Sequence, residues 1–169
     1  MQRGANIFAK KPKTAFHHKR ALDSHPDAHI FRSFPGVGLI TASTLLAEIG
    51  EDRRHYPAVG VLLAEAGLAP VTRASGRSHR VGFRYAANVR LREACMWWAF
   101  NSVKSSPWAR GAYDDARARG QQHHRALRGL GARWTRVLWR AWTDNQPYDP
   151  ARHLSVEMEL QGTGDTAAA

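Results

Sequence analysis

Two serines lie in the most strongly basic part of the chain. The stretch from Gly67 to Arg92 contains no Asp or Glu. Its arginines are Arg73, Arg77, Arg80, Arg84, Arg90 and Arg92, with Ser75 and Ser78 between them. A serine that attacks a phosphodiester needs cations to neutralise the charge that develops at phosphorus, and the planar guanidinium of arginine binds two phosphate oxygens at once. The stretch therefore has side chains suited to phosphate binding and meets one requirement of a serine nucleophile.

Turn-forming residues indicate how these serines are presented. Ala69 to Gly82 is predicted to be an exposed loop because proline and glycine interrupt it. The interrupting residues are Pro70, Gly76 and Gly82. His79 is the local candidate for a general base. On these residues alone, Ser75 is also explained as an ordinary loop residue whose hydroxyl bonds to the backbone.

Two glycines flank a valine in the segment Pro35-Gly36-Val37-Gly38, directly before an apolar stripe. This pattern is typical of a helix-hairpin-helix turn, in which the valine packs between the two helices. We expect Gly36 and Gly38 to take positive φ and to approach a phosphate, with the free N–H groups of the next helix pointing at the anion. Such a turn binds the DNA backbone without reading bases. The alternative is an ordinary tight turn between helices.

The acidic residues that a metal-dependent nuclease needs are scattered in this chain. Two-metal nucleases bring several carboxylates together on Mg²⁺. The acids predicted to lie near helix ends or in surface turns are Asp114, Asp115, Asp144 and Asp149. The pairs His17-His18 and His123-His124 have no Cys or i, i+4 carboxylate beside them. We therefore expect no metal ion and no cofactor in this chain.

Apolar residues recur with helical spacing through the middle of the chain, which predicts a mainly all-α fold. The stripes are Leu39 to Ile49, Ala58 to Ala66, Leu91 to Ser102 and Leu127 to Trp142. Gly50 and Gly67 are expected to end the first two, and Pro107 and Pro147 the last two. Most of the six tryptophans lie on or beside these stripes and are assigned to the core.

Charge and composition narrow the class of protein. The net charge of +11 and the isoelectric point of about 10.8 favour a polyanionic partner. Residues 1–25 are predicted to be a flexible basic arm, residues 26–153 one domain, and residues 154–169 a disordered tail. Cys95 is the single cysteine, which excludes a disulfide framework and fits a reducing compartment. We expect a cytoplasmic, nucleoid-associated protein without a membrane partner.

Four segments in order resemble the DEDD-type insertion-sequence transposases, the insertion-sequence family one-ten with its Piv and MooV invertase relatives. The segments are His25 to Phe31 running into Pro35 to Gly38, Ala66 to Gly76, Asn88 to Arg92, and Pro147 to Asp149. Each segment is short, and the order and spacing make the resemblance specific. It spans about Pro26 to Asp149 and points to the C-terminal, serine-bearing domain of these transposases.

The resemblance implies that Ser75 matches the serine that becomes covalently joined to DNA, with Ser78 as the fallback. It also implies a separate or ancestral RuvC-like nuclease half that holds Mg²⁺, a structured guide RNA in many members, and a homo-oligomer in the full-length family. The candidate DNA-binding residues are Gly36, Gly38, Arg73, Arg77, Arg80, Arg84, Asn88 and Arg92. One departure is that many members have Lys-x-Gly-Asn where this chain has Tyr85-Ala86-Ala87-Asn88.

The sequence therefore predicts the DNA-binding C-terminal domain of a transposase, in which a serine acts as nucleophile in strand exchange. We expect a truncated remnant that is inactive without the nuclease half. The alternative is a non-specific DNA- or RNA-binding helix-hairpin-helix module without catalysis. A protein-interaction domain would scatter its arginines over all faces, whereas here they bunch in one stretch.

Overall fold

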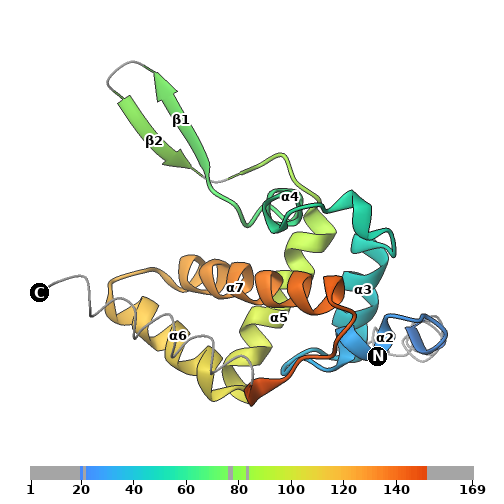
Figure 1. Cartoon of the computed structure of the whole chain (residues 1–169). Helices are drawn as coiled ribbons and strands as arrows, with labels where there is room; N and C mark the ends of the chain where they lie inside the picture. The colour runs from blue at the N-terminus through green and yellow to red at the C-terminus, as the bar shows by residue number, and fades with distance from the viewer. Residues whose placement is uncertain (1–19, 21, 76–77, 83, 152–169) are drawn as a thin grey trace, which may run out of the picture.

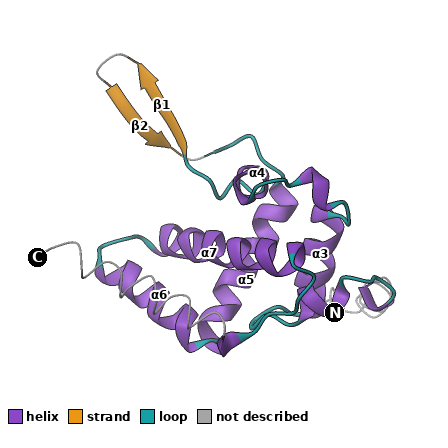
Figure 2. Cartoon of the chain, viewed as in Figure 1, coloured by secondary structure: helices purple, strands orange, loops and turns teal. Residues whose placement is uncertain are grey.

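The computed structural model describes residues 20, 22–75, 78–82 and 84–151. Most of these residues are helical (Figure 1; Figure 2). The helices are α2 (Ala28–Arg32), α3 (Leu39–Ile49), the 3-10 helix η1 (Arg53–His55), α4 (Val59–Glu65), α5 (Val89–Ser105), α6 (Pro107–Ala118) and α7 (His123–Thr143). Two strands, β1 (Val71–Ser75) and β2 (Ser78–Gly82), form a hairpin. The predicted mainly all-α class is confirmed, and a β-hairpin is added to it.

Two long helices, α5 and α7, carry the core. Helices α3 and α6 pack against α5, and α4 packs against α7. The apolar stripe of α5 buries Leu91, Ala94, Cys95, Trp98 and Ser102, and that of α7 buries Leu127, Leu130, Trp134, Leu138 and Trp142. These are residues that helical periodicity had placed on one face. The helix predictions for both stripes are confirmed.

Aromatic side chains fill the space between the long helices. The rings of Trp98 and Trp134 stack with centroids 5.4 Å apart. Each indole N–H has an acceptor, because Trp98 donates to the Pro35 carbonyl at 3.0 Å and Trp134 to the Ser102 hydroxyl at 2.8 Å. The first of these bonds ties the turn before α3 to α5. Trp97 is the exception to the predicted core assignment, since it is 62% exposed.

Pro107 ends one helix, as predicted, and also begins the next. The hydroxyl of Ser106 accepts a hydrogen bond from the Ala109 N–H at 3.3 Å and so caps α6. Proline is favourable at the first helical position because the N–H it lacks would have no partner there. Asp114 and Asp115, predicted to lie near helix ends or in turns, lie in the C-terminal half of α6, and Asp115 is in its last turn.

The hairpin replaces the loop that was predicted over Ala69 to Gly82. Strands β1 and β2 are antiparallel, and their register runs from Val71 opposite Gly82 to Ser75 opposite Ser78. The proline and glycines that predicted a loop lie at or beyond the strand ends, and the β-branched residues between them favour extended backbone. Figure 1 shows the hairpin projecting away from the helices.

The predicted flexible ends fall mostly outside the described residues, namely 1–19 and 152–169. The last part of the predicted basic arm is an exception. Leu22 is helical and only 1% exposed, and it belongs to the core cluster together with Phe31. The folded part therefore begins before the predicted boundary at residue 26.

Candidate nucleic-acid interface

The hairpin register groups the two candidate nucleophiles with two arginines. Ser75 and Ser78 are cross-strand partners at the end of the ladder, and Arg73 and Arg80 are partners two residues earlier. Partners in an antiparallel pair share one face of a sheet, and so do residues two apart along a strand. The backbone therefore places both serines and both arginines on one face. Arg77 lies outside the described residues.

The same register separates His79 from the serines. His79 is the cross-strand partner of Ala74, which is next to Ser75 in β1. Since neighbouring residues of a strand alternate between faces, His79 lies on the face opposite Ser75 and Ser78. The register therefore gives no support to His79 as the general base of Ser75, and that role stays a prediction.

Two predicted DNA-binding residues hold the segment after β2 to the helices. Asn88 caps α5 and donates from Nδ2 to the Glu48 carboxylate of α3 at 2.8 Å. Arg92 donates from Nη2 to the carbonyl oxygens of Arg84 at 3.1 Å and Tyr85 at 3.2 Å. These contacts give Asn88 and Arg92 a positioning role, and direct contact with DNA stays a prediction for both.

A cleft of about 430 Å³ lies where the hairpin joins the helices. Its lining residues are Gly67, Leu68, Ala69 and Pro70 before β1, Gly82 and Arg84 at the other end of the hairpin, and Gln121, Arg125, Arg128 and Gly129 of α7 and the residues before it. None of these described residues is acidic. Sequence reasoning found Arg84 but missed Arg125 and Arg128. In the sequence these two are indistinguishable from solubilising charges on a long helix.

Burial and like charges both act on Arg128. Burial lowers the pKa of its guanidinium, and the positive charges of Arg92 and Arg125 lower that pKa further. Arginine nonetheless stays protonated in proteins. On the other side of the cleft, the Nε of Arg84 is buried and has no hydrogen-bond partner within the described part of the chain. The cleft is therefore a partly desolvated concentration of positive charge.

The glycine turn before α3 differs from the predicted geometry. Gly36 has φ +77°, as expected, but Gly38 has φ −82° and ψ 171°, an extended conformation open to any residue. A Cβ on Gly36 would lie 2.5 Å from the backbone nitrogen of Ser102, so this glycine lets the turn pack onto α5. A Cβ on Gly38 would meet nothing within 4 Å. Positive φ is therefore wrong for Gly38, and a phosphate contact stays a prediction for both glycines.

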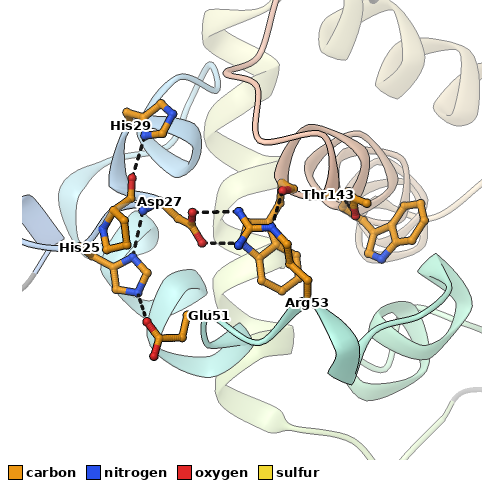
Figure 3. Close-up of polar contacts among 9 residues, drawn as sticks. His25, Asp27, His29, Glu51, Arg53 and Thr143 are labelled. Atoms are coloured by element: carbon orange, nitrogen blue, oxygen red, sulfur yellow. Dashed lines mark hydrogen bonds and ion pairs between the residues drawn. The ribbon is translucent and has the colours of Figure 1, made fainter.

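A partly buried ion pair joins Asp27 of the N-terminal segment to Arg53 of η1, and Asp27 also contacts α7 (Figure 3). Asp27 accepts hydrogen bonds from Arg53 Nη2 at 2.9 Å and from Trp142 Nε1 at 2.8 Å. The Asp27 N–H donates to His25 Nδ1 at 3.1 Å. Burial raises the pKa of Asp27, but the hydrogen bonds from Arg53 and Trp142 outweigh burial, so the pKa lies below its usual value. Asp27 is therefore ionised at neutral pH, and both of its carboxylate oxygens accept hydrogen bonds from residues of the fold.

The remaining reactive groups of the described chain show no second site. Burial raises the pKa of the Cys95 thiol to about 11, so this sulfur is not a nucleophile at neutral pH. Within the described ranges, no three His, Cys, Asp or Glu side chains are grouped as metal ligands. No helix there has both the length and the apolar character that crossing a bilayer requires.

Comparison with known proteins identifies relatives of this chain. It is 40% identical over 132 residues to a mini-circle protein assigned as the transposase for IS117 in Streptomyces coelicolor, an alignment that covers 78% of this chain and 32% of that protein. It is 36% identical over 138 residues to a 43.6 kDa protein of insertion element IS110 from the same organism, covering 81% of this chain and 34% of the relative. It is 37% identical over 128 residues to a 42 kDa protein of insertion element IS900 from Mycobacterium paratuberculosis. That alignment covers 75% of this chain and 32% of the relative.

The chain thus spans about a third of the length of the curated relatives it matches. Residues 28–114 match the model of the family described as Transposase IS116/IS110/IS902. This match takes in α2 to α5, both strands of the hairpin and most of α6. Because the match covers more than half of the 169 residues, the chain belongs to the IS116/IS110/IS902 transposase family.

Proposed function

We propose that this chain is the DNA-binding part of an insertion-sequence transposase and supplies a serine nucleophile, Ser75, for strand exchange. The observation that carries the proposal is the hairpin register, which puts Ser75 and Ser78 on the same face as Arg73 and Arg80. Arginines beside a hydroxyl are the arrangement that attack on a phosphodiester requires. The relatives' assignment to insertion elements makes DNA the phosphodiester in question.

In the proposed step the hydroxyl oxygen of Ser75 attacks the phosphorus of one DNA phosphodiester. A bond forms between the serine oxygen and phosphorus while one phosphorus–oxygen bond of the DNA backbone breaks. The released sugar oxygen takes a proton, and the proton of the serine passes to a base. Arg73 and Arg80 bind the non-bridging oxygens and neutralise their charge as the bond forms. The product is a phosphodiester that joins Ser75 to one DNA end. The hydroxyl of a second DNA end can then attack its phosphorus, which breaks the bond to the serine oxygen and returns a proton to that oxygen.

The base and the stabilisation of the leaving oxygen come from outside the hairpin. His79 is on the opposite face, and the described residues contain no acidic cluster. The resemblance implies an acidic nuclease half that would hold Mg²⁺, and that ion would supply both functions. The proposed active assembly includes such a half, joined or separate. The resemblance adds a guide RNA of the element and further copies of the chain, acting at the nucleoid.

A binding module without catalysis is the second candidate. The register favours it for the chain on its own, since it places His79 on the face of the hairpin opposite Ser75. In that case the arginines bind a DNA or RNA backbone and the serines only complete the hairpin. The two candidates differ in one observable, which is whether a covalent protein–DNA adduct forms.

The experiment combines the full chain with a nuclease half of the same family, its guide RNA and a labelled target duplex, and separates the products on denaturing gels. We expect an adduct only when all components are present. Ser75→Ala should abolish the adduct and keep DNA affinity within about threefold, because one hydroxyl contributes little beside several arginines. Ser78→Ala, the matched variant in the same register pair, should retain the adduct.

Three other outcomes would change the proposal. An adduct that survives Ser75→Ala but not Ser78→Ala would move the nucleophile to Ser78. Intact DNA binding without an adduct in any mixture would support the binding module. An adduct formed by the chain alone would overturn the need for a nuclease half.

A further inference from the structure

We propose that the cleft at the base of the hairpin binds a backbone phosphate of the DNA that the hairpin engages. The inference rests on the proposed DNA-binding function and adds a second contact on another element. The cleft brings Arg84, which follows β2, together with Arg125 and Arg128 of α7. These residues are remote in the sequence, so the fold itself gathers the three guanidinium groups.

The size of the cleft suits this ligand. Its volume of about 430 Å³ lies within the range of about 300–1,000 Å³ that is usual for ligand-binding clefts. A phosphate group with part of its adjoining sugars fits such a space. Gly67 lines the cleft, and the Arg92 guanidinium packs directly onto it, because a Cβ there would lie 2.7 Å from that group.

The positive charge of the cleft also favours an anionic ligand. No acidic side chain is among its described lining residues. Arg125 and Arg128 lie in the first two turns of α7 (His123–Thr143), where the partial positive charge of the helix N-terminus adds to their own. Planar guanidinium groups bind phosphate oxygens in pairs, so this set matches phosphate better than a single ammonium would.

Two arginines of the cleft have unfavourable features that a bound phosphate would relieve. The pKa of Arg128 is lowered by burial and by the charges of Arg92 and Arg125, and a nearby anion opposes this repulsion. The Nε of Arg84 is a buried donor without an acceptor in the described structure, and a phosphate oxygen can supply one. Both features lie on the lining of the same cleft.

Continuity with the hairpin makes DNA the occupant to test first. Gly67 to Pro70 lead directly into β1, and Gly82 and Arg84 lie at the other end of the hairpin. One wall of the cleft is thus the base of the element whose tip carries Ser75 and Ser78. A DNA strand that contacts the face of the hairpin with Arg73 and Arg80 can continue into the cleft.

The test compares variants of the full chain in titrations of a short fluorescent DNA duplex at several salt concentrations. The cleft variant is Arg125→Ala/Arg128→Ala. The matched control, Arg110→Ala/Arg133→Ala, removes two exposed charges from α6 and α7 that do not line the cleft. We expect the cleft variant to lose about tenfold in affinity at about 0.1 M salt and about one unit of the slope of log K against log salt, as for one lost phosphate contact. The control should lose less than about threefold.

Each other result has a distinct meaning. Equal losses in both double variants would overturn the cleft site, because total charge would then explain binding. A wild-type chain that does not bind DNA would overturn the proposed function itself. A loss confined to a matched RNA duplex would overturn DNA as the occupant. Should the half-buried Arg128 prove necessary for folding, Arg125→Ala against Arg133→Ala makes the same comparison at exposed positions of one helix.

Discussion

At the scale of single residues, Asp27 joins segments that lie far apart in the chain. Its side chain is almost completely buried, and it accepts hydrogen bonds from Arg53 of η1 and from the Trp142 indole of α7. Arg53 also donates from Nε to the Trp142 carbonyl at 2.9 Å. The three residues therefore fix the N-terminal segment and η1 on the last helix. Removing the charge leaves the buried indole N–H of Trp142 and the half-buried guanidinium of Arg53 poorly satisfied, which costs more than the hydrogen bonds themselves contribute.

We predict that Asp27→Asn lowers the free energy of unfolding by about 2–4 kcal/mol. The amide keeps one acceptor oxygen but loses the charge that pairs with Arg53, and its NH₂ group faces a donor. Urea denaturation at pH 7 measures the loss. Asp52→Asn is the control, because Asp52 pairs with Arg54 at an exposed position and its replacement should leave the midpoint nearly unchanged. Similar losses in both variants would contradict the role of the partly buried pair.

Measuring the stability of Asp27→Asn and of the wild-type chain at acid pH tests whether the negative charge of Asp27 is responsible for the loss. The pKa of Asp27 is lower in the folded chain than its unperturbed value of 3.8. Its stabilising contribution is therefore complete above that value and is lost as the pH falls through the folded pKa. The stability difference between the wild-type chain and Asp27→Asn should accordingly shrink at acid pH. A difference that stays constant through the acid range would assign the effect to shape instead of charge.

At the scale of elements, two glycines of one turn are predicted to differ in importance. Gly36 has positive φ and lies against the backbone of Ser102 in α5, whereas Gly38 is extended and faces open space. We expect Gly36→Ala to lower the free energy of unfolding by about 2–4 kcal/mol, since it adds both strain and a clash with backbone. Gly38→Ala should change it by less than about 1 kcal/mol. Thermal melts of both variants measure the contrast, and equal melting temperatures would contradict the packing role of Gly36.

The elements that sequence predicted are those with long apolar stripes. Helices α3, α4, α5 and α7 were predicted within a few residues. Helices α3, α5 and α7 each bury several apolar side chains at helical spacing, and the shorter α4 buries Leu62 and Leu63. Helix α6 was missed since its buried residues are only Ala109 and Ala116, a pattern too weak to show a face. The hairpin was missed because each strand has five residues and Arg73 and Arg80 interrupt any apolar alternation.

At the scale of the whole molecule, sequence identified one side of the basic surface but not the other. The charge asymmetry of Gly67 to Arg92 singled out Arg84 and the hairpin arginines without knowledge of the fold. Arg125 and Arg128 reach the same cleft because α4 packs against α7, which is a tertiary contact that no local pattern encodes. Similarly, whether Ser75 and His79 share a face of the hairpin depends on the strand register. That register is defined only once the predicted loop is known to be a hairpin.

The hairpin is predicted to be separable from the core. Within the described part of the chain, β1 and β2 contact chiefly each other. Replacing residues 72–81 with a glycine-serine linker of equal length should therefore change the free energy of unfolding by less than about 1 kcal/mol, or roughly 2–4 °C in melting temperature. DNA binding should weaken strongly, because the replacement removes Arg73, Arg77 and Arg80 at about one unit of salt slope for each phosphate contact. Loss of cooperative unfolding would show that the hairpin belongs to the core.

A second replacement distinguishes charge from register. A linker of the same length with three arginines but no β-forming residues restores the net charge without the pairing of Ser75 with Ser78. If the hairpin only concentrates charge, this variant recovers both the affinity and the salt slope of the wild-type chain. If the hairpin positions a nucleophile, the variant recovers much of the slope but forms no adduct with the nuclease half, even when a serine is kept at position 75. The second outcome is the one we expect, because attack on phosphorus requires the serine oxygen and the guanidinium groups to meet the same phosphate, which a flexible linker does not ensure.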